Sequence, residues 1–241
     1  MPTAQSNQST SFGVALTRWI NRRMLWVSRH WLAVTNTFFF FYVGLPFLAP
    51  ALLAAGFTGA ANTIYSAYRM ACHQFPSRAY FIFGEQVALC HRDLAIYATL
   101  LVGGLLFAFV RDRMKPPAFR WYLLFLIPIA FDGGTGLASE IAAVSPIWIL
   151  WVLGLVVIAI FSGVLYSQKQ LSWQYLLFFA CGPLSLIYLQ IFGSYESDLL
   201  RRNITGFIFG AGTVWFAYPY LQESFADIYQ STTAHLRRLS D

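Results

Sequence analysis

Charged side chains are scarce in this chain. Only 11% of its 241 residues are Asp, Glu, Lys or Arg, whereas 58% are hydrophobic. A soluble domain carries roughly 25% charged residues, because its surface has to remain hydrated. The composition therefore excludes an ordinary soluble domain and predicts a protein that crosses a membrane several times.

Several sequence motifs are also absent, and each absence excludes a class of function. Three cysteines are too few for the disulfide framework of a small secreted protein. The sequence contains no phosphate-binding loop, zinc-protease motif, nucleophile elbow or dinucleotide fingerprint. Its six excess positive charges form no basic stripe with interleaved aromatic residues, so nucleic acid is not expected as a partner. We expect the lipid bilayer as the main partner, with other membrane subunits as further candidates.

Six apolar segments are each long enough to cross about 30 Å of hydrocarbon. They cover residues 32–55, 88–110, 119–138, 147–166, 173–193 and 203–221. We therefore predict an all-α polytopic membrane protein with about six transmembrane helices. The first apolar run is too long for the core of a cleavable signal peptide, so we expect it to be retained. In the last segment, the Gly-x-x-x-Gly spacing of Gly206 and Gly210 predicts close helix packing.

Two polar flanks complete the predicted domain organisation. We expect a polar tail and basic interfacial segment at 1–30, a transmembrane domain at 31–221 and a cytoplasmic tail at 222–241. The first twelve residues are small and polar, which predicts disorder. Residues 13–30 carry four arginines among tryptophan and aliphatic side chains. That pattern suits either a helix lying in the membrane interface or an ordinary basic flank of the first span.

The distribution of Lys and Arg predicts the orientation. With the N-terminus in the cytoplasm, the inner segments hold 11 of the 16 basic residues and the outer segments hold 5. Cytoplasmic loops of membrane proteins carry the excess of Lys and Arg. We therefore expect both termini inside, and the connector that follows the first span on the extracytoplasmic face.

That connector and the start of the second span contain two Cys-His pairs, Cys72-His73 and Cys90-His91. Thiolates and imidazoles are ligands that zinc and iron favour. On a helix that begins here, Cys90 and Asp93 share one face, whereas His91 is rotated away from it. We predict a metal site of Cys72, His73, Cys90 and Asp93 for zinc or iron, with His91 as a substitute ligand.

Two alternatives to the metal site stay open. A disulfide could join Cys72 to Cys90, because both would face an oxidising compartment. Both could equally be free thiols packed among aromatic side chains. Cys181 lies beside a Gly-Pro pair within a predicted span, and we expect it to serve only in packing.

A supporting polar cluster is expected at the same membrane face. Its members are Arg92, Asp132, Glu196 and Arg201. Charges at membrane depth usually pair with one another or face the interior of the helix bundle. For Asp132, at the outer end of the third span, the candidate partners are Arg92, Arg201 and Arg202. A turn at Asp132-Gly133 would explain this residue equally well.

A series of short motifs runs from about residue 70 to residue 210. In chain order they are Cys72-His73-Gln74, Pro76-Ser77-Arg78-Ala79-Tyr80-Phe81, Gly84 with Gln86, Cys90-His91-Arg92-Asp93, Ile96-Tyr97, Asp132-Gly133-Gly134-Thr135, Glu196-Ser197, and Arg201 with Thr205-Gly206. Together they resemble a family of uncharacterised bacterial and archaeal membrane proteins. The resemblance implies the fold, the location of the site and a prokaryotic cytoplasmic membrane, but no reaction.

The sequence departs from that family in three ways. Asp93 stands where the family has a second cysteine, which weakens the closed zinc site that the resemblance would imply. Gly136 stands where glutamine is usual. About 60 residues, including two of the predicted spans, separate the Asp-Gly motif from the Glu-Ser motif, which lie close together in shorter relatives.

These observations predict a function only in outline. We expect an integral membrane protein with an outward-facing Cys/His/Asp site of a metal-binding or redox type. The alternative is a non-catalytic accessory subunit of a larger electron-transport or photosynthetic complex, because 8 Trp, 13 Tyr and 23 Phe give more ring area than six helices need inside. A transporter is less well supported, since the spans hold few charges and no inverted repeat is evident.

Overall fold

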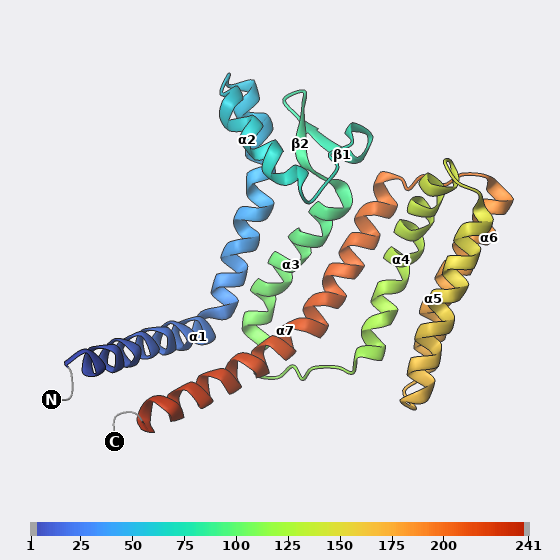
Figure 1. The fold of residues 1–241 in the computed structure, drawn as a ribbon. Coiled ribbons are helices and arrows are strands. Elements are labelled where there is room, and N and C mark those ends of the chain that lie inside the picture. Colours follow the sequence, from blue (N-terminus) through green and yellow to red (C-terminus); the bar gives the residue numbers. More distant parts are fainter. Residues whose placement is uncertain (1–3, 239–241) are drawn as a thin grey trace.

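The computed structural model describes residues 4–238 (Figure 1). Within this range the chain forms seven α-helices, one short 3-10 helix and one antiparallel hairpin of two strands. The elements are α1 (Ala4–Ala54), α2 (Thr58–Arg69), η1 (Pro76–Arg78), β1 (Ala79–Ile82), β2 (Glu85–Cys90), α3 (His91–Val110), α4 (Phe119–Ala142), α5 (Ile147–Ser167), α6 (Trp173–Phe192) and α7 (Leu199–Arg238). The helical membrane architecture expected from the sequence is confirmed.

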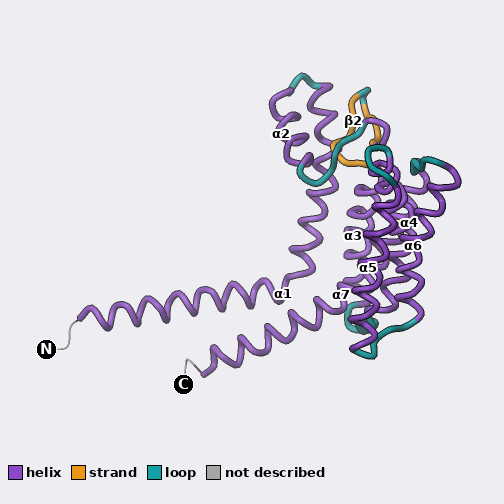
Figure 2. Tube along the Cα trace, turned by 45° about the vertical axis from the view of Figure 1, so that its right-hand side comes forward, coloured by secondary structure: helices purple, strands orange, loops and turns teal. Residues whose placement is uncertain are grey.

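The long helices stand side by side in a row. Helix α1 contacts α3 and α7, α7 lies against α3 and α4, α4 packs on α6, and α5 packs mainly on α6. In Figure 1 the row therefore runs from α1 to the α5–α6 pair. Helix α2 and the hairpin lie at the end of the helices where α1 ends and α3 begins. The N-terminal part of α1 and the C-terminal part of α7 project from the opposite end (Figure 2).

Five helices are long and apolar enough to cross a membrane within the described part of the chain. They are α3, α4, α5, α6 and the Leu16–Ala54 portion of α1, and they coincide with five of the six predicted spans. The sixth predicted span lies inside α7, which runs between α3 and α4 in the same row. Its residues 204–221 carry no charge, but two tyrosines, a tryptophan and a proline lower their hydropathy.

The first helix differs from the prediction for the N-terminal flank. Helix α1 begins at Ala4, so the disorder predicted for residues 1–12 is wrong from Ala4 onward, and residues 1–3 lie outside the described range. No proline interrupts the chain between Ala4 and Leu45, so the helix can continue from the span through the polar flank.

The hairpin is a second difference, because the predicted second span began at residue 88 and α3 begins at His91. Phe83 and Gly84 connect the strands with φ values of +56° and +81°, as a two-residue turn with both residues in the left-handed region requires. The apolar stretch Val87–Leu89 is fully buried in β2. A short apolar run next to a helix has no pattern that separates it from the helix, which explains the misplaced boundary.

Close packing of α7 on α3 depends on the two glycines that the sequence pattern singled out. A Cβ atom at Gly206 would lie 2.7 Å from the backbone oxygen of Arg92, and one at Gly210 would lie 2.8 Å from the Cβ of Thr99. The predicted role of this spacing in helix packing is confirmed. The contact brings the N-terminal ends of α3 and α7 together, and the site described below lies there.

We expect Gly206→Ala to destabilise the protein by about 1–3 kcal/mol, the usual cost of forcing extra volume into a tight contact. The matched control is Gly154→Ala in α5, where a Cβ would meet no atom within 4 Å. Thermal unfolding in detergent, followed by circular dichroism, measures both variants. Equal melting temperatures for the two would contradict a packing role for Gly206.

Candidate functional site

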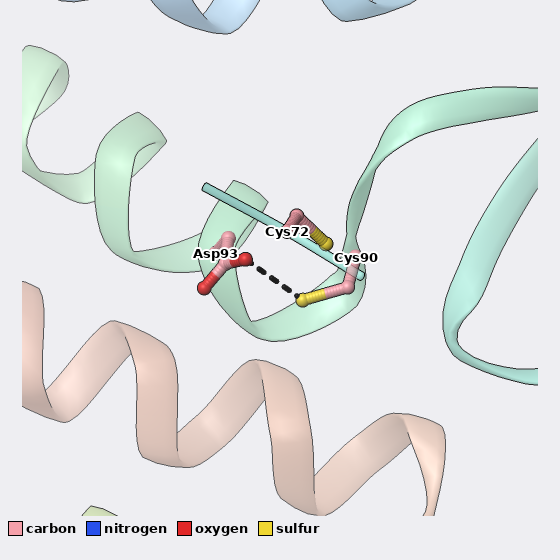
Figure 3. A group of neighbouring side chains, drawn as sticks. All are labelled: Cys72, Cys90 and Asp93. Carbon is pink, nitrogen blue, oxygen red and sulfur yellow. Dashed lines mark hydrogen bonds between the residues drawn. The ribbon is translucent and has the colours of Figure 1, made fainter. Parts of the chain in front are cut away.

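Three potential metal ligands converge where β2 meets α3. The Sγ atoms of Cys72 and Cys90 and a carboxylate oxygen of Asp93 all lie within 4.8 Å of one another. The Cys90 thiol donates a hydrogen bond of 3.1 Å to Oδ2 of Asp93. Figure 3 shows the three side chains turned toward one another from the loop after α2, the end of β2 and the first turn of α3. We call Cys72, Cys90 and Asp93 the ligand group.

The start of α3 places two members of this group. Cys90 has an extended backbone (φ −75°, ψ 161°) and is the N-cap of α3, and Asp93 follows in the first turn. A carboxylate in the first turn interacts favourably with the positive end of the helix dipole. The two side chains are thus in contact, but as the N-cap and a first-turn residue and not on one face of a helix as predicted, because α3 starts three residues later than expected.

Two glutamine side chains hold the Cys72 loop against β2. The amide of Gln74 donates to the backbone oxygens of Tyr65, at 2.8 Å, and Ala88, at 3.2 Å. In return, the amide of Gln86 donates to the backbone oxygen of Gln74 at 2.8 Å. Gln74 also has a positive φ of 53°, so the chain turns sharply after the Cys-His pair. This clamp, formed by Gln74 and Gln86, sets Cys72 beside Cys90.

The two histidines lie outside the ligand group. His73 is exposed, and its ring stacks on Phe75 with centroids 5.8 Å apart. His91 is buried, and its ring meets the Tyr80 ring edge-on at 4.4 Å. Cys72 is buried, whereas its neighbour His73 is exposed and lines the cavity at which the ligand group lies. Of the four predicted ligands the structure therefore brings together three and leaves out His73. The substitute ligand His91 contacts Tyr80 of the hairpin instead.

The two thiols of the group have opposite acidities. The neighbouring Cys90 side chain, together with backbone hydrogen bonding near Gln74, lowers the pKa of the Cys72 thiol to about 7 although burial acts against it. The pKa of the Cys90 thiol is raised by its hydrogen bond to Cys72, by burial and by the negative charge of Asp93. Both cysteines are free thiols in this structure. The pair therefore favours a Cys72 thiolate stabilised by a protonated Cys90.

Asp132 is the centre of a second polar group beside the first. This carboxylate is only 4% exposed and forms an ion pair with the Arg92 guanidinium. It also accepts hydrogen bonds from the hydroxyl of Tyr195 and, at 2.9 Å, from the hydroxyl of Ser197. Of the three arginines considered as partners, Arg92 makes the pair. Because Asp132 lies within continuous α4, the alternative explanation as an interfacial turn does not apply.

One cavity of about 320 Å³ joins the two groups. Its walls include the ligand group, Asp132, Tyr195, Glu196, Glu140 and three arginines, Arg78, Arg92 and Arg202. Arg78 pairs with Glu140 at 2.8 Å. Arg202 is buried, and its Nε donates to the backbone oxygen of Ser197 at 2.8 Å. The cavity thus combines sulfur and carboxylate ligands with guanidinium groups.

The predicted supporting cluster is only partly assembled around this cavity. Arg92, Asp132 and Glu196 line it, with Glu196 exposed at its edge. Arg201 is exposed, interacts with Asp198 at 3.5 Å and lies over the Tyr195 ring. Its neighbour Arg202 takes the buried place. The pattern Arg-Arg at the start of a helix does not reveal which of the two faces inward, and this depends on how α7 packs on α3.

Alkylation tests the acidity of Cys72. In metal-stripped protein carrying Cys181→Ala, we expect the alkylation rate of Cys72 to rise with pH around a midpoint near 7, because the thiolate is the nucleophile. Adding Cys90→Ala removes the side chain that lowers the pKa of Cys72 most and moves the midpoint toward the ordinary thiol value of about 8.5. Mass spectrometry of the labelled peptides measures both. A midpoint that Cys90→Ala leaves in place would show that the thiols do not interact.

Substitution of the buried carboxylate tests the second group. Asp132→Asn leaves the Arg92 guanidinium without its counter-ion, which we expect to cost about 3 kcal/mol of unfolding free energy. The control is Glu140→Gln, which breaks the more exposed pair with Arg78 and should cost under about 1 kcal/mol. Denaturation in mixed detergent compares the two. Similar losses would contradict the central role of Asp132.

Comparison with known proteins places the chain in a family. A sequence model described as predicted membrane protein (DUF2085) matches residues 72–156, from Cys72 through α3 and α4 into α5. The chain is 38% identical over 119 residues to the uncharacterized protein MJ1492 of Methanocaldococcus jannaschii, an alignment that covers 46% of this chain and 75% of that relative. No solved structure matches this chain. The expected resemblance to an uncharacterised membrane-protein family is confirmed: this integral membrane protein belongs to the DUF2085 family of predicted membrane proteins.

Proposed function

We propose that the protein binds a divalent metal ion, zinc or iron, through Cys72, Cys90 and Asp93. The observation that carries the proposal is the convergence of three ligand atoms within 4.8 Å beside a polar cavity. Two ligand atoms on one tetrahedral zinc ion lie about 3.5–4 Å apart, because zinc–ligand bonds are about 2.0–2.3 Å long. Small rotations of the three side chains would reach that geometry.

The number of ligands favours an exchangeable or reactive site. Structural zinc sites are closed by four protein ligands, whereas catalytic sites hold three and leave a position for water or substrate. Here the third ligand is a carboxylate, and neither histidine belongs to the ligand group, although His73 lines the same cavity. A metal bound in this way would supply Lewis acidity toward a ligand in the cavity. The distribution of Lys and Arg supports an extracytoplasmic location for the site, and the archaeal relative is consistent with a prokaryotic cytoplasmic membrane.

The same cysteines could instead form a redox pair. Oxidation of Cys72 and Cys90 to a disulfide would release two protons and two electrons to an acceptor. The lowered pKa of the Cys72 thiol would also suit attack in thiol–disulfide exchange. Metal content and thiol reactivity, measured on the same sample, separate these two functions.

Metal analysis of detergent-purified protein is the direct test. We expect about one zinc or iron ion per chain in the wild type, little in Cys90→Ala or Asp93→Ala, and full content in Cys181→Ala, whose cysteine lies in α6. His73→Ala should keep the metal if the fourth position is open. Absence of metal, with Cys72 and Cys90 unreactive until reduced, would overturn metal binding in favour of a disulfide.

A role as an accessory subunit is the second candidate. Phe38, Phe40 and Phe41 project from α1 at one edge of the row and are all more than half exposed. Other subunits or lipid would cover these rings equally well. Partners that co-purify in fixed proportion in a mild detergent would support this role, and recovery of the protein alone would contradict it.

A further inference from the structure

Three guanidinium groups face the cavity from different parts of the fold. Arg78 comes from η1, Arg92 from the first turn of α3 and Arg202 from the first turn of α7. Like charges in a partly buried site repel one another. Their positive charges therefore need compensation at the cavity.

Carboxylates of the protein form ion pairs with only two of the three. Glu140 pairs with Arg78 and Asp132 pairs with Arg92. Within residues 4–238, no carboxylate forms an ion pair with Arg202, although this residue is only 7% exposed. A buried charge without a counter-ion is costly.

The donors of Arg202 are only partly used inside the protein. Its Nε donates to the backbone oxygen of Ser197, which fixes the plane of the guanidinium. The remaining N–H groups of a guanidinium form a fork that fits carboxylate and phosphate oxygens. Arg202 lines the cavity, so such an oxygen could reach it from there.

Arg92 offers a second donor. One of its nitrogens is engaged by Asp132, but its Nε is buried and has no hydrogen-bond partner among the described residues. A Cβ at Gly133 would lie 2.9 Å from Nη1 of Arg92, so the glycine leaves room for the guanidinium. An unsatisfied buried donor next to a cavity is a natural place for an acceptor oxygen of a ligand.

Two helix ends add to the positive potential. Helices α3 and α7 begin at His91 and Leu199, and their first turns carry Arg92 and Arg202 at the cavity. Helix N-termini favour anions through their free N–H groups and their dipoles. Acidic groups line the cavity as well: Asp132 and Glu140 are already paired, Glu196 is exposed at the edge, and Asp93 belongs to the ligand group. Anion binding would therefore depend on the directed donors of Arg202 and Arg92 and not on an overall positive charge of the cavity.

We propose that the cavity binds an oxyanion group of the phosphate type, held by Arg202 and Arg92 beside the ligand group. As a ligand of the metal centre this anion rests on the proposed function, but its recognition by arginine does not. Residues from the starts of α3 and α7 and from the end of α4 line the cavity, and lipid headgroups would meet water at this end of the spans. The group can therefore belong to a phospholipid or to a free phosphate.

Inorganic phosphate is the first probe, titrated into detergent-purified protein at constant ionic strength. Thermal stabilisation and broadening of the phosphorus NMR signal report binding. We expect Arg202→Gln to weaken binding by about tenfold or more, the loss of a charge-assisted hydrogen bond. The matched control is Arg201→Gln, which removes an exposed arginine at the next position and should leave binding unchanged.

Arg202→Lys tests whether Arg202→Gln loses binding only because it misfolds. Lysine keeps the positive charge and loses only the forked donors of the guanidinium. We expect it to melt near the wild type and to bind phosphate with intermediate affinity. Repeating the titration after metal removal separates the two proposals. Arg202-dependent binding that persists after metal removal would show that the anion site does not need the metal, whereas the metal content of the protein as purified decides the metal site.

Vesicles identify the source of the phosphate group. Protein reconstituted in phosphatidylcholine with added phosphatidic acid is extracted, and its retained lipids are counted by native mass spectrometry. Retention of phosphatidic acid by the wild type but not by Arg202→Gln assigns the site to a headgroup. Binding of inorganic phosphate alone assigns it to a free anion. If neither probe binds, or if Arg201→Gln and Arg202→Gln lose binding equally, the proposal is wrong.

Discussion

The buried carboxylate of Asp132 is the constraint on which the site depends. It binds Arg92 at the start of α3 and accepts hydrogen bonds from Tyr195 and Ser197 in the segment that leads into α7. Ser197 in turn accepts a hydrogen bond from Arg202 through its backbone oxygen. A buried ion pair gains little net stability, because desolvation offsets much of its attraction. Its value here is orientation, since one carboxylate from α4 fixes the first turns of two other helices.

The ligand group is oriented by different means. Hydrogen bonds between Gln74, Gln86 and backbone oxygens tie the Cys72 loop to β2, and the start of α3 fixes Cys90 and Asp93. These contacts are neutral and lie outside the helix row, whereas those of Asp132 are ionic and lie within it. Two supports of different kinds therefore meet at one cavity, and they share the first turn of α3, which carries Arg92 and Asp93.

Sequence reasoning found the helices and much of the site. Long apolar segments have few conformational choices in a bilayer, so five of the predicted spans coincide with helices that meet the length and hydropathy criteria. The pairing of Asp132 with a nearby arginine also followed from the cost of charge in a membrane. The hairpin was missed because its buried strand is as apolar as a span. The exposed position of His73 depends on the local path of the Cys72 loop, which no residue type indicates, and the choice between Arg201 and Arg202 depends on helix packing.

The place of α5 and α6 bears on how such proteins diverge. The pair lies at one edge of the row, α5 has no buried residue, and α4 ends at the same end of the row at which α7 begins. Two helices that leave and re-enter at one membrane face do not reverse the direction of anything that follows them. Insertion or loss of this pair would therefore be topologically silent, with α7 crossing in the same sense and the cavity still closed by the same helices. Shorter and longer chains can thus share one site without a change in which face of the membrane it serves.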